Sequence, residues 1–244
     1  MDLSAARFAA ESLRLVPRKR LSRMLGRLAD LQGPSAIVDQ AVDAFVRVYG
    51  VDLTEAEVPP HGFESFDAFF TRRLREGARP ILGDLDVLTC PCDGRLFDAG
   101  IIDGSAQFVA KGHAYDVAEL LGPGSHPSVF ENGAYAIIYL APPDYHRVHA
   151  PVNGTVSSAR HVAGTLFPVN SIGTKYVPRV FAKNERIAVI QDADDGLEVA
   201  TILVGAIGVG RISLAFDDMQ SNSGSAGETR EFGHSGPVLA RGDE

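Results

Sequence analysis

The stretch Tyr139-Leu-Ala-Pro-Pro-Asp-Tyr-His-Arg-Val-His-Ala-Pro-Val-Asn-Gly154 combines turn-forming prolines with two histidines. Because proline fixes φ and lacks an amide donor, this stretch cannot form one continuous helix. Its pattern predicts a strand over 136–140, a rigid turn at the two prolines, a short strand that carries both histidines, and a turn at Asn153-Gly154. Residues three apart in a strand point to opposite faces, so His146 and His149 would have different neighbours and could do different jobs.

From residue 77 onward, short apolar runs alternate with turn residues. Hairpins are predicted at Asp103-Gly104, between strands over 96–102 and 106–110, and at 194–196, between strands over 187–191 and 197–204. One brief helix is predicted at 117–121. Residues 77–244 are therefore expected to form a mainly antiparallel β-barrel or β-sandwich.

Residues 1–76 are predicted to be helical and to contact membranes, which makes the fold class α+β. Apolar and basic residues alternate over 4–31, with a break near Pro17, which is typical of two basic amphipathic helices. Such helices can pack on the body or lie in the headgroups of an anionic membrane, and the two arrangements are compatible.

Two more helices are predicted before the β-rich body begins. The first ends at Gly50, and its core face is predicted to contain Ile37, Ala41, Phe45 and Val48. The second begins after Ser65 as N-cap and places Phe66, Phe69, Phe70 and Leu74 on one face. These phenylalanines are expected to belong to the core.

The charge of the 244-residue chain is unevenly distributed. The net charge is −8, but residues 1–34 hold seven of the 23 Lys and Arg and three of the 31 Asp and Glu, a net charge of +4 against −12 for the rest. We therefore expect the N-terminal segment to meet an anionic partner and the body to bind no nucleic acid.

The two cysteines, Cys90 and Cys92, are too close to close a useful loop and lack the spacing of a zinc site, which favours a reducing, cytosolic compartment. No run of about eighteen apolar residues could span a bilayer, and the N-terminus lacks the apolar region of a signal peptide. A soluble or peripheral protein is expected.

Single features leave the chemistry open. Asp93, in Cys90-Pro-Cys-Asp-Gly94, alone suggests a turn with an Asx hydrogen bond. His146 and His149 alone could be structural histidines, catalytic bases or metal ligands.

Read together, six motifs are more specific than any one of them. In this order and spacing they resemble the phosphatidylserine decarboxylase family, from about residue 63 to the end of the chain. They are Phe69-Phe-Thr-Arg-Arg-Leu-Arg-Glu-Gly-Ala-Arg-Pro-Ile81, Cys90-Pro-Cys-Asp-Gly94, Lys111-Gly-His-Ala-Tyr115 with Leu120-Leu-Gly122, Asp144-Tyr-His-Arg-Val-His149, Leu166-Phe-Pro-Val-Asn170 and Lys183-Asn-Glu-Arg186.

The resemblance implies a proenzyme that cuts itself before a serine in a Leu-Gly-Ser-Thr motif and converts that serine into a pyruvoyl group. This chain resembles the larger, β subunit, ending a few residues before the cut, so the pyruvoyl cofactor is expected on a separate α subunit. Asp93 and His149 would act on the missing serine as in a Ser-His-Asp arrangement, and His146 would protonate the substrate carbon after CO2 leaves. The chain departs from many relatives at Pro168, where they have serine, and no substrate role is transferred to that side chain.

The resemblance also implies conversion of phosphatidylserine to phosphatidylethanolamine, without a metal ion, by a dimer of α/β pairs. The enzyme would be peripheral, on the cytoplasmic face of the inner membrane, and residues 1–31 would contact the anionic lipid surface. Two alternatives are a metal-dependent hydrolase with His146, His149 and Asp93 as ligands, and a non-catalytic lipid- or partner-binding β-domain.

Overall fold

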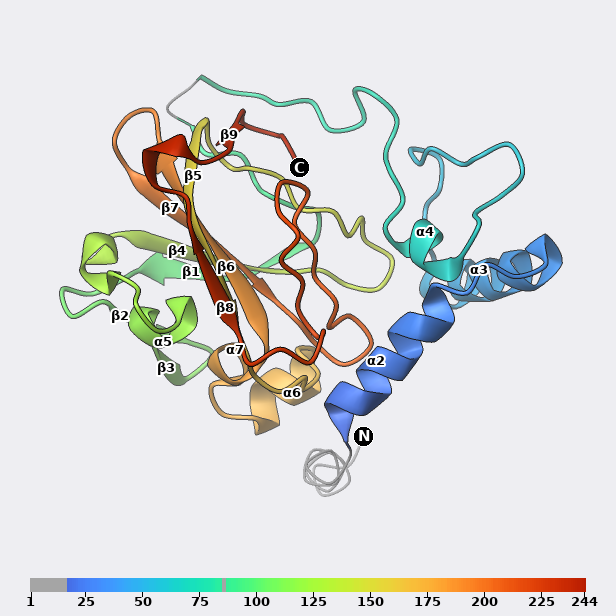
Figure 1. Ribbon diagram of the computed structural model, residues 1–244, viewed down its shortest axis with the longest axis horizontal. Helices are drawn as coiled ribbons and strands as arrows, with labels where there is room; N and C mark the ends of the chain where they lie inside the picture. Colours follow the sequence, from blue (N-terminus) through green and yellow to red (C-terminus); the bar gives the residue numbers. More distant parts are fainter. Residues whose placement is uncertain (1–16, 85–86) are drawn as a thin grey trace. The chain divides into compact units, whose positions relative to one another are not determined.

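The computed structural model describes residues 17–84 and 87–244, which form two compact units (Figure 1). The first unit contains the described residues up to Leu25 together with Asp98–Ile137 and Gly154–Val238. The second unit contains Gly26–Phe97, Ile138–Asn153 and Leu239–Glu244. The domain boundary that the sequence suggests at residue 76 stays a prediction.

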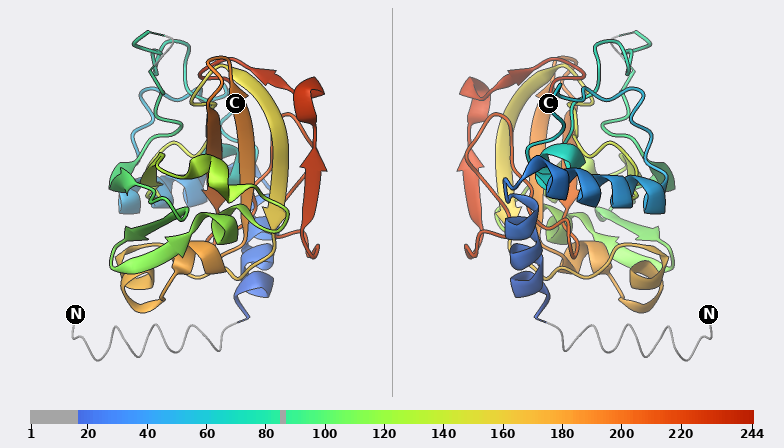
Figure 2. Two further views of the ribbon diagram at one scale, coloured as in Figure 1. Left: turned by 90° about the vertical axis from the view of Figure 1, so that its left-hand side faces the viewer. Right: turned by 90° about the vertical axis from the view of Figure 1, so that its right-hand side faces the viewer.

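A curled antiparallel sheet forms the centre of the first unit (Figure 2). Its strand order is β7-β6-β5-β8, and β9 also pairs with β5. The strands are β5 (Gly154–Val162), β6 (Arg186–Ala193), β7 (Glu198–Val204), β8 (Glu228–Glu231) and β9 (Val238–Leu239). The predicted β6–β7 hairpin is confirmed, and its register pairs Asp192 with Glu198.

Four other strands form two further pairs, and here one predicted hairpin is wrong. β1 (Arg95–Ile101) pairs with β4 (Ala134–Tyr139), whereas β2 (Gln107–Ala110) pairs with β3 (His113–Asp116). Lys111 and Gly112 both have positive φ, 49° and 78°, the backbone that a two-residue hairpin turn needs. The turn at Asp103 is instead closed by its own carboxylate, which accepts hydrogen bonds from the Ser105 and Gln107 amides.

The main core of the first unit lies among β2, β3, β6 and the predicted helix α5 (Val117–Leu121), which is confirmed. Phe108 stacks on Tyr115 with ring centroids 5.5 Å apart, and Leu121 is 1% exposed. The short helices α6 (Ser171–Tyr176) and α7 (Val180–Lys183) and the 3-10 turns η1 (Pro127–Phe130) and η2 (Gly233–Ser235) complete this unit.

Arg186, the first residue of β6, is buried without a carboxylate partner among its hydrogen bonds. Its guanidinium donates to backbone carbonyls at the ends of α5 and α7, namely those of Glu119, Leu120, Ala182 and Asn184. Burial lowers the pKa of Arg186 to about 10. The carbonyl groups satisfy the hydrogen-bond donors that burial would otherwise leave unpaired.

The helical part of the second unit has a phenylalanine core. α3 (Ser35–Tyr49) ends, as predicted, at Gly50, whose φ is +68°. Phe69, on α4 (Phe66–Phe70), is 0% exposed, and the hydroxyl of Ser65 caps α4 by accepting from the Ala68 amide. Phe45 of α3 packs edge-on against the Phe69 ring.

The predicted core face of α3 is only partly correct, because Phe45 packs against the core but Ile37, Ala41 and Val48 are exposed. Ile37 and Val48 are 64% and 75% exposed, whereas Val38 and Val42 are each 6% exposed. Periodicity locates the apolar stripe on a helix, but the neighbouring phenylalanines decide which edge of that stripe is covered.

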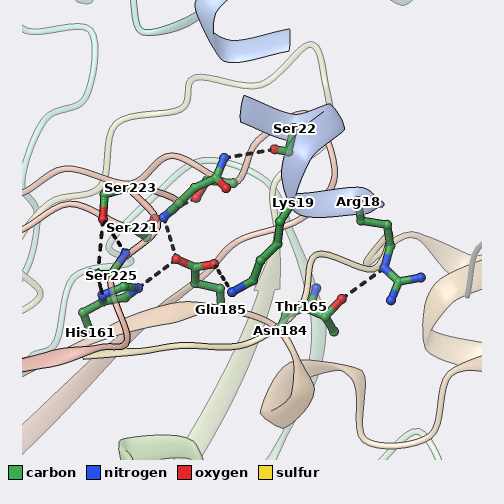
Figure 3. Close-up of polar contacts among 12 residues, drawn as sticks. Arg18, Lys19, Ser22, His161, Thr165, Asn184, Glu185, Ser221, Ser223 and Ser225 are labelled. Atoms are coloured by element: carbon green, nitrogen blue, oxygen red, sulfur yellow. Dashed lines mark hydrogen bonds and ion pairs between the residues drawn. The ribbon is translucent and has the colours of Figure 1, made fainter. Parts of the chain in front are cut away.

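The part of α2 (Arg18–Ala29) that belongs to the first unit is bound to the rest of that unit by polar side chains (Figure 3). Arg18 donates to Thr165 Oγ1 at 3.0 Å, and Lys19 Nζ lies 3.4 Å from the carboxylate of Glu185. The hydroxyl of Ser22 accepts a hydrogen bond from the side-chain amide of Asn222. Its apolar residues are largely exposed, with Met24 at 51% and Leu28 at 55%. The first predicted amphipathic helix lies outside the described residues.

The described residues thus combine helices with antiparallel sheets, and the α+β class is confirmed. Closure into a barrel or sandwich stays a prediction. In the ranges 17–84 and 87–244, no helix has both the length and the hydropathy that crossing a membrane requires.

Candidate active site

Residues 141–150, here called the histidine loop, carry both predicted catalytic histidines in the second unit. They are not a strand, which corrects the prediction. The carboxylate of Asp144 accepts a hydrogen bond from the Ala141 amide at 2.6 Å and closes the turn at the two prolines. Proline cannot donate to a strand ladder, and the backbone of this segment forms hydrogen bonds with side chains and with separate loop segments rather than with a neighbouring strand.

Arg72, directly after α4, holds the histidine loop from one side. Its Nη2 donates to the carbonyls of Pro143 and Asp144, at 3.0 and 3.5 Å. The side chain is buried, and its other two nitrogens have no hydrogen-bond partner within the described part of the chain. The pKa of Arg72 is lowered by burial, and Asp93 and Asp144 oppose that effect.

His146 has a defined tautomer. Its Nδ1 lies 2.8 Å from the carbonyl oxygen of Asp144, and because a carbonyl only accepts, Nδ1 carries the hydrogen. Nε2 of the neutral ring is then a proton acceptor. The ring packs on Phe70 with centroids 4.0 Å apart. Burial lowers the pKa of His146 below its usual value, and the positive charge of Arg72 adds to this, so the imidazole is neutral at neutral pH.

His149 has the same tautomer but different neighbours. Its Nδ1 donates to the carbonyl of Gly242 at 2.8 Å, and its Nε2 lies 3.0 Å from the hydroxyl of Tyr145. Burial raises the pKa of Tyr145, so this phenol stays protonated and its O–H is the donor of the hydrogen bond to Nε2. The amide of His149 donates to Pro91 O, which joins the loop to the segment that carries Asp93.

Asp93 forms a two-point ion pair with Arg79. The Nε–Oδ1 and Nη2–Oδ2 distances are 2.8 and 2.7 Å, and Arg79 also contacts Glu55 at 2.7 Å. Asp93 and His149 lie in neighbouring segments, but Asp93 is paired with Arg79 and His149 with Gly242 and Tyr145, so the structure does not join them directly. Gly94 has a φ of +115°, and a Cβ there would lie 2.5 Å from the carbonyl of Tyr139, so only glycine fits this close approach.

The last residues of the chain, 239–244, are hydrogen-bonded to the histidine loop. Ala150 donates to Asp243 O, and Gly242 donates to Ala150 O. Arg147 reaches the carboxylate of Glu244 at 2.5 Å and also donates to Thr71 O. These contacts hold residues 239–244 beside His149.

Most of the chain is similar to proteins of one known family. The model of a family described as phosphatidylserine decarboxylase matches residues 66–244. The chain belongs to the phosphatidylserine decarboxylase family. It is similar to the phosphatidylserine decarboxylase proenzyme of Methylococcus capsulatus, with 44% identity over 83% of this chain and 70% of the relative. The corresponding proenzymes of Bordetella pertussis and Myxococcus xanthus are 42% and 36% identical, over 83% and 95% of this chain and 68% and 82% of theirs.

The described residues of this decarboxylase do not form a cluster of metal ligands at the histidines. Across residues 17–84 and 87–244, no three His, Cys, Asp or Glu side chains gather in a way that could hold a metal ion. Burial also raises the pKa of Cys92 to about 12, so its thiol stays protonated and is a poor metal ligand. The family membership disfavours both alternatives, the metal-dependent hydrolase and the non-catalytic domain.

The sequence did not single out four residues that contact the histidine loop or Asp93, namely Phe70, Arg72, Arg79 and Tyr145. Phe70 packs against the phenylalanine core, as predicted, and its ring also packs on His146. Arg72 and Arg79 lie in one of the six family motifs, which could have singled them out. Their partners are 14 to 72 residues away, and no local pattern shows such pairs.

Arg72→Gln is expected to raise the pKa of His146, because it removes a positive charge that opposes protonation of the ring. The imidazole would then become protonated at a higher pH, and a rate that needs neutral His146 would begin to fall at a higher pH. A histidine NMR titration measures this shift. Arg73→Gln is the matched control, since Arg73 is the exposed neighbour. Equal shifts in both variants would contradict a specific effect of Arg72.

Proposed function

We propose that this chain is the β subunit of a pyruvoyl-dependent phosphatidylserine decarboxylase, with the histidine loop as part of its active site. The reaction is a lyase reaction that removes CO2 from the serine headgroup and leaves phosphatidylethanolamine. The observation that carries the assignment is the family match over residues 66–244, which includes the whole histidine loop.

The residues present fit a pyruvoyl group on a partner chain. Loss of CO2 needs an electron sink, and the pyruvoyl carbonyl supplies one when the group is present. Nε2 of His149 is an acceptor whose hydrogen bond from Tyr145 can be exchanged for one from a serine hydroxyl. Residues 239–244 already lie against this loop, so a serine that follows in a proenzyme reaches His149 without a long excursion.

Asp93 is proposed as the carboxylate that orients His149 during self-cleavage. In the structure Arg79 holds this carboxylate, and the carbonyl of Gly242 holds Nδ1 of His149. An Asp93–His149 pair therefore requires both partners to be exchanged. The α subunit would also pair as a strand with the β-rich body and complete its barrel or sandwich.

His146 is proposed to deliver the proton that replaces CO2. Because its ring is neutral and its Nδ1–H is bound to Asp144, Nε2 must first accept a proton. The ammonium group of the incoming substrate must lose a proton before its nitrogen can react. The substrate can therefore supply the proton that Nε2 accepts. Nε2 then returns this proton to the substrate carbon.

Mass spectrometry of protein from a reading frame that includes the self-cleavage serine tests this function. We expect two chains, the smaller with an N-terminal pyruvoyl group that cyanoborohydride and a substrate amine convert to a stable adduct. A single chain, or a small chain with an ordinary amino terminus, would count against the assignment.

The membrane contact is proposed to come from residues 1–31. Arg18 and Lys19 of α2 are bound to the first unit, so the exposed Arg20 and Arg27 and the apolar Leu28 and Leu31 are left to meet an anionic lipid surface. This would make the enzyme peripheral on the cytoplasmic face of the inner membrane. Assembly as a dimer of α/β pairs is part of the same proposal.

Changing Arg20 and Arg27 to Glu is expected to weaken binding to anionic vesicles. Each basic residue near such a surface is worth about 1 kcal/mol, so losing two corresponds to roughly 30-fold weaker binding, and high salt should reduce the difference. Vesicle sedimentation measures it. Arg95→Glu with Lys175→Glu is the control, with the same charge change at exposed positions elsewhere. Binding that neither variant nor salt alters would show that α2 does not contact lipid.

A further inference from the structure

His161, on β5 of the first unit, is a buried imidazole between a serine and a glutamate (Figure 3). Its side chain is 0% exposed. Nε2 lies 2.8 Å from Oε1 of Glu185, and Nδ1 lies 3.1 Å from Oγ of Ser225. Ser225 itself is exposed. None of these three residues belongs to the histidine loop or to the second unit.

The partners of Glu185 define the tautomer of His161. Oε1 accepts a hydrogen bond from the backbone amide of Asn222 at 2.5 Å, and Nζ of Lys19 lies 3.4 Å from Oε2. A backbone amide and a lysine ammonium group both face this carboxylate, which is therefore placed as a hydrogen-bond acceptor. Nε2 of His161 therefore carries the ring hydrogen, and Nδ1 is an acceptor for the hydroxyl of Ser225.

Two glycines shape the backbone around Ser225, and one of them, Gly227, approaches β5 closely. Gly224 and Gly227 have φ values of +98° and +101°. A Cβ on Gly227 would lie 2.8 Å from the carbonyl of His161, so a larger residue cannot follow this path. The serine is thus held where its hydroxyl meets the imidazole and its other side faces solvent.

We propose that Ser225 is a second reactive serine, with His161 as its general base and Glu185 as the group that orients the base, and that it reacts with carboxylic esters. A nucleophile within hydrogen-bond reach of a base that a third group orients is the arrangement that activates a serine. This site is independent of the proposed decarboxylation.

In the reaction, Oγ of Ser225 attacks the ester carbonyl carbon while its proton passes to Nδ1 of His161. The bond from that carbon to the alcohol oxygen breaks, and the alcohol leaves with the proton from Nδ1. The acyl group stays on Ser225 until water, activated at the same Nδ1, releases it as a carboxylic acid and restores the free serine. Glu185 stabilises the imidazolium that forms between these steps.

A fluorophosphonate probe, which reacts with activated serines, tests this assignment on the full-length processed protein. We expect peptide mapping to find the probe on Ser225, with no label at that peptide in Ser225→Ala. Ser235→Ala is the matched control, because Ser235 is another exposed serine of the first unit that lies outside this loop, and the variant should label at the wild-type rate. p-Nitrophenyl acetate should place an acetyl group on the same residue.

His161→Gln is expected to slow labelling by roughly 10²-fold or more, the usual contribution of a general base. Because a buried substitution can disturb folding, Ser225→Cys and Ser235→Cys provide a second comparison in which His161 is intact. Iodoacetamide should alkylate Cys at position 225 at least about tenfold faster, since the imidazole promotes the thiolate. Absence of probe from Ser225 in the folded wild-type protein, or equal alkylation of the two cysteine variants, would overturn the proposal.

Discussion

His149→Ala in the complete proenzyme is expected to leave the precursor uncut. The substitution removes the imidazole whose Nε2 would take the proton of the attacking serine hydroxyl, and an unactivated hydroxyl is a weak nucleophile. It also removes the hydrogen bond to the carbonyl of Gly242, which holds the end of the chain in place. Gel electrophoresis of freshly expressed protein shows the ratio of uncut precursor to the two products.

Two further variants locate the effect of His149. Tyr145→Phe removes the hydroxyl that donates to Nε2 but leaves the base, so the proenzyme should still cut itself. Asp93→Asn should behave like His149→Ala, because an amide cannot stabilise the charged ring as a carboxylate does. Normal cutting in His149→Ala would remove this histidine from the self-cleavage mechanism.

His146→Ala is expected to cut normally and to decarboxylate slowly. Loss of a group that moves a proton in the rate-limiting step typically costs 10²–10⁴-fold in rate, and a drop of roughly that size in kcat is predicted. The neutral ring and its fixed tautomer support a role in turnover, since Nε2 can both accept and return a proton. Release of CO2 from labelled phosphatidylserine measures the rate.

His113→Ala is a matched control for His146→Ala, because it makes the same change on β3 in the other unit. It should leave both cutting and turnover unchanged. If His146→Ala and His149→Ala impair cutting equally, the two histidines do not have separate roles.

Local signals in the sequence predicted the local structure well. α5 begins and ends where its pattern indicated, the Ser65 cap formed, and the β6–β7 hairpin closed at the expected turn. In each of these cases the interacting residues are neighbours in the sequence, so a window of a few residues contains the groups that determine the local structure. The order of six motifs was enough to indicate the family.

The polar contacts of the candidate site could not be predicted in the same way. His149 takes its Nδ1 acceptor from Gly242, 93 residues away, and Arg72 reaches Asp144 across 72 residues. The strand predicted for the histidine loop failed because the Asp144 carboxylate and Arg72 satisfy backbone groups that a strand partner would otherwise satisfy. The sequence named the three candidate residues but not the partner each one holds.

The buried guanidinium of Arg186 couples segments that are far apart in the chain. Its donors are satisfied only when the carbonyl ends of two helices, about 60 residues apart in sequence, have both been assembled around it. A lysine could not replace Arg186, because a single ammonium nitrogen cannot reach the four carbonyl groups that the three nitrogens of the planar guanidinium reach. If β6 packed into the core before either helix formed, the buried guanidinium would lack hydrogen-bond partners. The two helices and β6 are therefore expected to fold cooperatively.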